Sequence, residues 1–227
     1  MELGRIKSGI LGGTFDPIHN GHLRAAVEIL EEFSLDRIYL IPTFNPPHKN
    51  PDSITPFTHR FAMARLAAED MPEFDVLDIE GVRGGFSYTI DTVSELKKRA
   101  DCGELFLITG MDAFLDIRLW KNYKKLLELI NVIIVRRLGY ESDIPENLLK
   151  DLGALNPVIC KSLYGMGNII KREIFSGMNL YVMSIPQLEI SGTEIRKKLE
   201  QGQSIRYFLP DRVLSYIKKE GLYAGPA

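Results

Sequence analysis

The sequence lacks any apolar run that approaches the roughly 20 residues needed to cross a bilayer. The segment from Met1 to Gly13 is too short and too rich in glycine to serve as a signal peptide. Both absences argue against a membrane partner and against export. We therefore expect a cytoplasmic protein.

An excess of charge of one sign is missing as well. Lysine and arginine number 28 against 30 aspartates and glutamates, which gives a formal net charge of −2. A chain without a general positive field is a poor partner for nucleic acid, because that binding depends on neutralising phosphates. Any site for an anion must therefore be built locally.

Cysteine is scarce, since Cys102 and Cys160 are the two in the chain. They are not in a metal-ligand spacing, and two cysteines in a chain of this size are more often reduced thiols than a disulfide framework. We expect neither to carry function.

The rest of the composition is that of a globular protein, with 45% of 227 residues apolar and 26% charged. Short runs rich in Ile, Val, Leu and Tyr alternate with helical patterns, of which residues 21–33 are the clearest. Strands are predicted at residues 5–11, 37–42, 74–80, 104–109, 131–136 and 180–183. Helices are predicted at residues 21–33, 58–70, 88–100, 120–129, 192–201 and 211–220. This alternation predicts an α/β fold, a doubly wound Rossmann-like parallel sheet with helices on both faces.

The alternation fails between Leu138 and Asn179, where Gly, Pro and Asn interrupt short ambiguous segments. We expect an irregular insertion there. No repeat, low-complexity tract or linker divides the chain. The sequence therefore predicts one domain over residues 1–227, with residues 190–227 as a small C-terminal helical appendage.

The most informative stretch is GGTFDPIHNGH, residues 12–22, between the first predicted strand and the first predicted helix. Gly12 and Gly13 let the backbone approach a ligand closely, and the following helix directs free N–H groups and its positive dipole end at an anion. His19 and His22 are three residues apart, so a helical turn would project both imidazoles to one side. There they can donate to phosphoryl oxygens, and the stretch predicts a phosphate site.

Two other interpretations of this stretch stay open. The glycines alone would suit a simple tight turn. Asp16, His19 and His22 could instead ligate a divalent metal, as in a metal-dependent hydrolase. Against this, His48 and His59 do not repeat the spacing.

The pattern G-G-T-F-D-P-x-H-x-G-H resembles the signature of the nucleotidylyltransferase superfamily, whose H-x-G-H motif is matched by residues 19–22. Residues 190–196, ISGTEIR, are similar to the superfamily's I-S-x-T-x-I-R motif, which closes on the phosphates of ATP. Ser191 and Glu194 also form a capping box, which predicts a helix start. One turn into that helix, Arg196 can place a guanidinium on the same triphosphate.

The order of the segments between these motifs resembles the bacterial nicotinate-nucleotide adenylyltransferase family. The matching segments are PTFNPPHK (42–49), SYTIDT (87–92), GMDAFLDIRLW (110–120), VRRLGY (135–140) and YFLPDRVLSYI (207–217). The resemblance implies an enzyme of NAD biosynthesis that transfers the adenylyl group of ATP to nicotinate mononucleotide and releases pyrophosphate. It also implies Mg²⁺, carried with the ATP phosphates, as the cofactor.

The resemblance implies a role for each matching position. The implied catalytic residues are His19, His22 and Arg196. The implied ATP-binding residues are Gly12, Gly13, Thr14, Phe15, His19, His22, Gly110, Asp112, Arg137, Ile190, Ser191, Thr193 and Arg196. The residues implied for the mononucleotide are Asn45, His48, Lys49, Thr89 and Trp120. Plainer structural roles stay open for Arg137 and Lys49 as solvated side chains, Trp120 as core and Thr89 as a helix cap.

Two further functions stay open. One is a preference for nicotinamide mononucleotide, because backbone donors to a carboxylate cannot be inferred from side-chain identity. The other is a nucleotide-sensing module that keeps the cleft and does no chemistry. The intact set of matched phosphate donors argues against the sensing module.

Overall fold

The computed structural model describes residues 6–99, 103–137, 143–163, 168–186 and 188–224. The strands are β1 (Lys7–Gly13), β2 (Arg37–Pro42), β3 (Phe74–Val76), β4 (Glu104–Gly110), β5 (Asn131–Arg137), β6 (Val158–Lys161), β7 (Asn168–Glu173) and β8 (Asn179–Ile185). The helices are α1 (Asn20–Glu32), α2 (Phe57–Ala68), α3 (Ile79–Arg83), α4 (Thr89–Leu96), α5 (Met111–Leu115), α6 (Tyr123–Leu127), α7 (Glu146–Asp151), α8 (Gly192–Glu200) and α9 (Asp211–Lys219). Short 3-10 turns, η1 and η2, lie at Pro51–Ser53 and Ile117–Leu119. Within the described ranges, no helix is both long and apolar enough to span a membrane.

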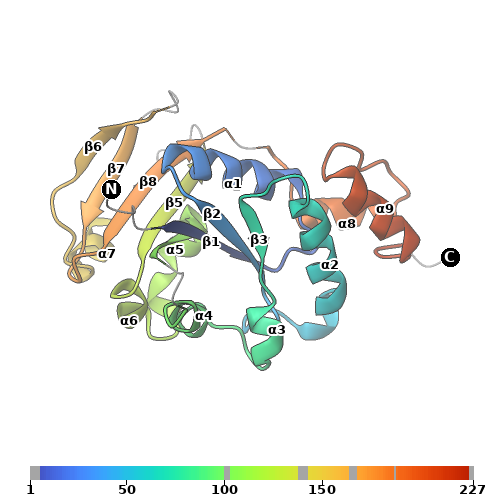
Figure 1. The fold of residues 1–227 in the computed structure, drawn as a ribbon, viewed down its shortest axis with the longest axis horizontal. Coiled ribbons are helices and arrows are strands. Elements are labelled where there is room, and N and C mark those ends of the chain that lie inside the picture. The colour runs from blue at the N-terminus through green and yellow to red at the C-terminus, as the bar shows by residue number, and fades with distance from the viewer. Residues whose placement is uncertain (1–5, 100–102, 138–142, 164–167, 187, 225–227) are drawn as a thin grey trace. The chain divides into compact units, whose positions relative to one another are not determined.

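The strands form one mixed sheet in the order β3-β2-β1-β4-β5-β8-β7-β6 (Figure 1). Strand β4 pairs in parallel with β1 and β5, and β5 pairs in parallel with β8. The predicted parallel sheet is confirmed for these four strands. Their apolar runs are long enough to fill a buried interior, as parallel strands covered on both faces require.

The expectation of an irregular insertion between Leu138 and Asn179 is wrong for its described part. That part contains α7, β6 and β7, and β7 pairs antiparallel with both β6 and β8. Both strands are largely exposed or half-buried, so they lack the apolar alternation that identifies a strand in the sequence. Ladder hydrogen bonds, from β7 to β8 and from β6 to β7, define them rather than burial.

Other element boundaries differ from the prediction by a few residues, and β3 and α6 show the reasons. Strand β3 ends at Val76 instead of continuing to residue 80, because helix α3 begins at Ile79. Helix α6 begins at Tyr123, after Asn122 in a left-handed conformation with φ of 50°. Trp120 therefore precedes that helix.

The chain forms two compact units, each assembled from distant segments. The first comprises residues 1–11, 28–38 and 88–186, and the second comprises residues 12–27, 39–87 and 187–227. One domain over residues 1–227 stays a proposal.

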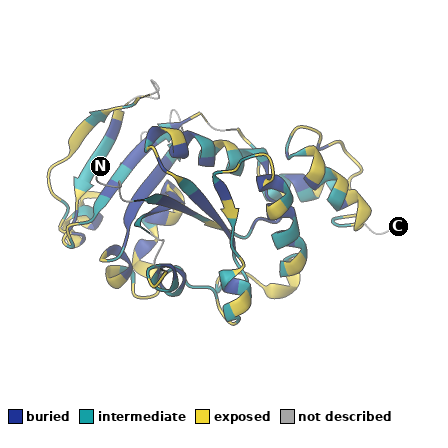
Figure 2. Ribbon diagram, viewed as in Figure 1, coloured by how far each residue is buried: buried dark blue, intermediate teal, exposed yellow. Residues whose placement is uncertain are grey.

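The core of the first unit lies along its parallel strands, which are dark blue in Figure 2. Leu107, Ile133 and Ile134 are among the side chains buried there. A Cβ on Gly9 of β1 would lie 3.0 Å from a methyl group of Ile108, so this position favours glycine. Because glycine has no Cβ, the side chain of Ile108 can lie directly against the backbone of β1.

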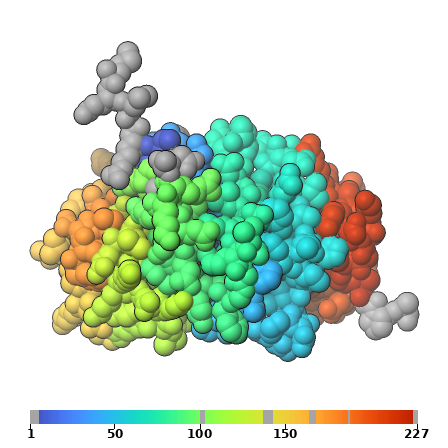
Figure 3. All heavy atoms as spheres, turned by 60° about the horizontal axis from the view of Figure 1, so that its bottom comes forward, coloured from blue at the N-terminus to red at the C-terminus, as the bar shows by residue number. Residues whose placement is uncertain are grey.

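The second unit joins α2 to the C-terminal helices. Helix α9 packs against α2, and α8 and α9 form the red end of the surface in Figure 3, next to the cyan α2. Val213 and Ile217 of α9 and Met63 of α2 are buried. The expected helices after residue 190 are thus present, and their apolar faces fix the C-terminal segment within this unit.

Candidate phosphate-binding site

The loop after β1 is held in one conformation by close contacts. The carbonyl of Gly13 accepts a hydrogen bond of 2.8 Å from the N–H of Thr43. A Cβ on Gly13 would lie 2.9 Å from the ring of Phe15, which is itself buried. Glycine at position 13 therefore permits the aromatic ring to lie under the loop. We name residues 12–22 the signature loop.

His19 and His22 lie side by side at the start of α1. Their rings stack with centroids 3.7 Å apart and planes 25° apart, and Phe15 meets His22 edge-on at 5.1 Å. The two imidazoles thus lie on one side, as their spacing predicts. Within the part of the chain that the structure describes, the buried Nδ1 of His19 has no hydrogen-bond partner. Such an atom is uncommon in folded proteins, where most buried polar groups have a partner.

Both histidines are neutral at pH 7. Burial lowers the pKa of His19 from 6.5 to about 4, and burial together with the neighbouring His19 lowers the pKa of His22 to about 3. Nδ1 of His22 accepts from the backbone N–H of His19 at 3.3 Å, so the ring proton of neutral His22 is inferred to be on Nε2. His22 therefore offers an N–H donor without carrying charge.

We expect His19 and His22 to contribute no inflection near pH 6.5 to kcat/KM for ATP. Because the free-enzyme pKa values of His19 and His22 lie near 4 and 3, both rings stay neutral as the pH falls from 8 to 6. Their lowered pKa values also make the fold lose stability as the pH falls below 6.5, since the unfolded chain binds these protons first. A pH series of initial rates, with the unfolding midpoint followed in parallel, measures both. A rate inflection near 6.5 that His22→Asn abolishes would contradict this account.

The late motif folds as a capped helix against the signature loop. Ser191 is the N-cap of α8, and its hydroxyl accepts from the N–H of Glu194 at 3.1 Å, as the capping box predicts. A Cβ on Gly192 would lie 2.9 Å from the carbonyl oxygen of Asp16. Glycine there allows the first turn of α8 to approach the loop backbone closely.

Arg196 joins the two motifs directly. Its Nη1 donates to the backbone carbonyl of Asp16 at 2.5 Å, and its Nη2 donates to the hydroxyl of Thr193 at 3.3 Å. The guanidinium is half-buried and keeps further N–H groups for a ligand. Two segments 180 residues apart thus supply the imidazole and guanidinium donors of one unit. Of the other late-motif residues, Ile190 is half-buried and precedes the cap.

Asp16 does not join the histidines as a third metal ligand. Its carboxylate accepts from the hydroxyl of Tyr223 at 2.6 Å and from the N–H of Thr55 at 3.3 Å, and it lies 3.9 Å from Nη1 of Arg196. Across the described ranges, no three His, Cys, Asp or Glu residues are grouped to hold a metal ion. The contacts of Asp16 therefore do not support the metal-ligand interpretation of residues 16–22.

The loop after β2 also reaches the signature loop. Nζ of Lys49 donates to the hydroxyl of Thr14 at 3.0 Å. Asn45 and Ser87 exchange hydrogen bonds, with the Asn45 N–H on the Ser87 hydroxyl at 3.2 Å and the Ser87 N–H on the Asn45 carbonyl at 2.9 Å. His48, which lies between Asn45 and Lys49 in the sequence, is exposed. Asn45 and Lys49 thus lie in the same unit as the two histidines.

The remaining predicted site residues belong to the first unit. Gly110 ends β4 and is exposed, as is Asp112 in the first turn of α5. Thr89 is the first residue of α4, after Tyr88 at the N-cap, and Trp120 is half-buried rather than in the core. Arg137 ends β5 opposite Ile185, and the predicted segment beyond it, 138–140, lies outside the described residues.

Sequence reasoning missed Arg60, which organises the backbone around the signature loop. Its side chain is 1% exposed. Its guanidinium donates to four backbone carbonyls, those of Thr55 at 2.7 Å, Thr14 at 2.7 Å, Thr43 at 2.7 Å and Phe44 at 3.1 Å. The available signal was a charged residue among the apolar positions of a predicted helix, since arginine is almost never fully buried unless paired.

Fold and site together define a nucleotide-binding α/β protein, in which imidazole, guanidinium and helix-start N–H groups gather near the end of β1. Residues 10–198 match the cytidylyltransferase-like family. The chain is 44% identical to a protein of Citrifermentans bemidjiense named "Probable nicotinate-nucleotide adenylyltransferase", over 96% of this chain and 98% of that one. A protein of the same name from Geobacter sulfurreducens is 40% identical over 96% of this chain and 99% of its own.

Solved structures show the same fold. The Plasmodium falciparum nicotinic acid mononucleotide adenylyltransferase complexed with NaAD superposes with a TM-score of 0.70 at 23% identity, covering 96% of this chain and 97% of that one. Its complex with APC gives a TM-score of 0.69 at 22% identity with the same coverage. The chain belongs to the cytidylyltransferase-like family and, within it, to the nicotinate-nucleotide adenylyltransferases.

Proposed function

We propose that this enzyme transfers the adenylyl group of ATP to nicotinate mononucleotide, forming deamido-NAD and releasing pyrophosphate in NAD biosynthesis. The observation that carries the proposal is the contact of Arg196 with the signature loop, which unites both phosphate motifs in one unit. The shared name of relatives about 40% identical over almost the whole chain supports the choice of substrates.

The chemistry needs no covalent intermediate. The phosphate of the mononucleotide attacks the α-phosphorus of ATP in line, a new P–O bond forms, and the bond to the β-phosphate breaks with its electron pair leaving on pyrophosphate. The attacking phosphate is already ionised, so no side chain has to remove a proton. Catalysis then rests on positioning and on donors aimed at the developing charge, which we assign to His19, His22 and Arg196.

The other residues are proposed to bind the two substrates. For ATP they are Gly12, Gly13, Thr14, Phe15, Gly110, Asp112, Arg137, Ile190, Ser191 and Thr193. For the mononucleotide they are Asn45, His48, Lys49, Thr89 and Trp120. The ammonium of Lys49, exposed beside Thr14, is placed to supply a point charge for a phosphate. Half-buried Trp120 keeps ring surface accessible for stacking on a pyridine.

Mg²⁺ is proposed to enter with ATP. The ion is small and strongly hydrated, and proteins usually hold it through substrate phosphates and water. The donor set fits that mode, because His19, His22 and Arg196 present N–H groups to phosphate oxygens while the carboxylate of Asp16 is engaged by Tyr223 and Thr55. When bound, Mg²⁺ would neutralise charge on the triphosphate. A cytoplasmic location is proposed from the sequence.

Comparing two co-substrates tests the substrate assignment. Pyrophosphate release is measured with ATP, Mg²⁺ and either nicotinate mononucleotide or nicotinamide mononucleotide, as kcat/KM. We expect the acid to be preferred by tenfold or more, equivalent to about 1.4 kcal/mol of transition-state binding. Equal values or a preference for the amide would overturn the assignment.

A further inference from the structure

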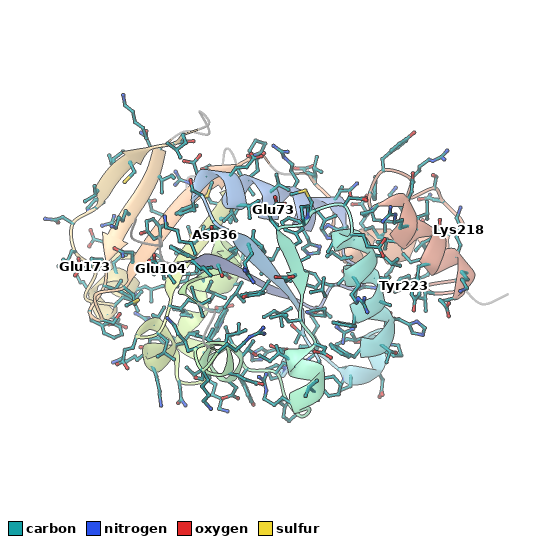
Figure 4. The ribbon with its side chains drawn as sticks, viewed as in Figure 1. Asp36, Glu73, Glu104, Glu173, Lys218 and Tyr223 are labelled. Carbon is teal, nitrogen blue, oxygen red and sulfur yellow. The ribbon has the colours of Figure 1, made fainter. Side chains whose placement is uncertain are left out.

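A C-terminal tyrosine reaches the signature loop. Tyr223 follows α9, is half-buried, and is labelled in Figure 4. Its hydroxyl donates to Oδ1 of Asp16 at 2.6 Å, and Asp16 is 8% exposed. A short hydrogen bond between a phenol and a buried carboxylate is among the stronger kinds in proteins. The contact joins residues 207 positions apart, and the function assigned so far does not use it.

Asp16 is also the residue that receives Arg196. Its backbone carbonyl accepts from Nη1 of Arg196 at 2.5 Å, while its Oδ2 accepts from the N–H of Thr55 and lies 3.9 Å from the same Nη1. In the described part of the chain, Tyr223 makes the one hydrogen bond to Oδ1. Without the phenol, a buried carboxylate oxygen would lack this donor, and the guanidinium of Arg196, 3.9 Å from Oδ2 of the same carboxylate, is a charged group able to supply one.

We propose that Tyr223 is a positioning residue for adenylyl transfer, which satisfies the Asp16 carboxylate and so leaves the guanidinium of Arg196 available to the phosphates of ATP. The proposal rests on the proposed function, which supplies the reaction. Its geometric basis is the set of contacts made by Asp16. A carboxylate without its phenol partner would compete with ATP for the same guanidinium. Affinity for ATP, rather than for the mononucleotide, should then fall.

The phenol is a donor at all working pH values. Burial, with the hydrogen bond to Asp16, raises the pKa of Tyr223 well above its ordinary value of 10. The hydroxyl therefore remains protonated while Asp16 accepts from it.

Other contacts hold the C-terminal segment when the hydroxyl is removed. The backbone N–H of Asn20 donates to the carbonyl of Phe208 at 2.8 Å, and its side-chain amide donates to the carbonyl of Tyr207 at 2.8 Å. The buried Val213 and Ile217 keep α9 on α2. A phenylalanine at position 223 loses one oxygen and keeps the ring, so the variant should fold.

Tyr216 offers a matched control. It lies in α9, and its hydroxyl pairs with Nδ1 of His59 in α2 at 2.9 Å, away from Asp16. Tyr223→Phe is expected to raise KM for ATP about tenfold, the size of one charge-assisted hydrogen bond. Its KM for nicotinate mononucleotide should stay within about twofold, and Tyr216→Phe should change neither value.

Repeating the substitution in an Arg196→Lys variant distinguishes a positioning role of Tyr223 from a merely structural one. If Tyr223 acts through Arg196, then Tyr223→Phe should weaken ATP binding by less than about twofold once Arg196→Lys is present. Affinity for ATP with Mg²⁺ is read by calorimetry without a co-substrate, so the result does not depend on which mononucleotide reacts. An equal loss in both backgrounds, or an unchanged KM for ATP with a lowered unfolding midpoint, would overturn the proposal. Failure of the wild type to release pyrophosphate would instead overturn the proposed function.

Discussion

Replacing His22 by alanine is expected to lower kcat by at least about 10²-fold, the usual loss when one preorganised donor to a developing oxyanion is removed. His22 is stacked on His19, edge-on to Phe15 and hydrogen-bonded through Nδ1 to the loop backbone, so its Nε2–H is already aimed before substrate arrives. Alanine removes that donor, and water in its place has no fixed orientation. Initial rates at saturating ATP and nicotinate mononucleotide measure the loss.

His59 provides the control for this variant. It lies in α2 of the same unit and pairs with Tyr216, away from the signature loop. His59→Ala should keep kcat within about twofold of wild type. If His22→Ala turned over at a near wild-type rate, the catalytic assignment of His22 would fall.

Replacing Arg60 by methionine is expected to lower the free energy of unfolding by about 2–4 kcal/mol. Methionine fills much of the same volume and donates no hydrogen bond, so four carbonyls lose a charged donor at once. The carbonyl of Thr14 directly precedes Phe15, and the carbonyl of Phe44 directly precedes Asn45. Denaturation by urea, followed by circular dichroism, gives the change in unfolding free energy from the midpoint and slope.

Arg65 is the matched control on the same helix. It is exposed one turn beyond Arg60, and Arg65→Met should change the unfolding free energy by less than about 0.5 kcal/mol. The central role of Arg60 would be refuted if its methionine variant were as stable as that of Arg65. Lysine at position 60 should be intermediate, because one ammonium cannot serve carbonyls on several sides at once.

Local patterns in the sequence were sufficient to predict how the two histidines and the late helix start are arranged. His19, His22 and Ser191 are defined by spacings of three residues, and such spacings decide on which side of one helical turn a group lies. The parallel strands β4 and β5 were predictable for a similar reason, since a short apolar run between turn signals is typical of a buried strand. In these cases the physical cause lies within a few residues of the feature itself.

The contacts missing from the prediction join residues that are far apart in the chain. Tyr223 and Asp16 are 207 positions apart, and Arg60 binds carbonyls up to 46 positions away. No periodicity encodes such pairs, because their hydrogen bonds depend on tertiary packing. The exposed strands β6 and β7 were missed for another reason: their stability comes from ladder pairing, which leaves no apolar alternation in the sequence.

The central claim is adenylyl transfer, and following the α-phosphate of ATP tests it most directly. ATP labelled at that phosphorus is incubated with the enzyme, Mg²⁺ and nicotinate mononucleotide. We predict that the label moves into the dinucleotide, with one pyrophosphate released per labelled product and none without the mononucleotide. Label that remained in bound ATP whichever mononucleotide was present would identify a sensing module, and label recovered in AMP would identify a hydrolase; either result would contradict the account.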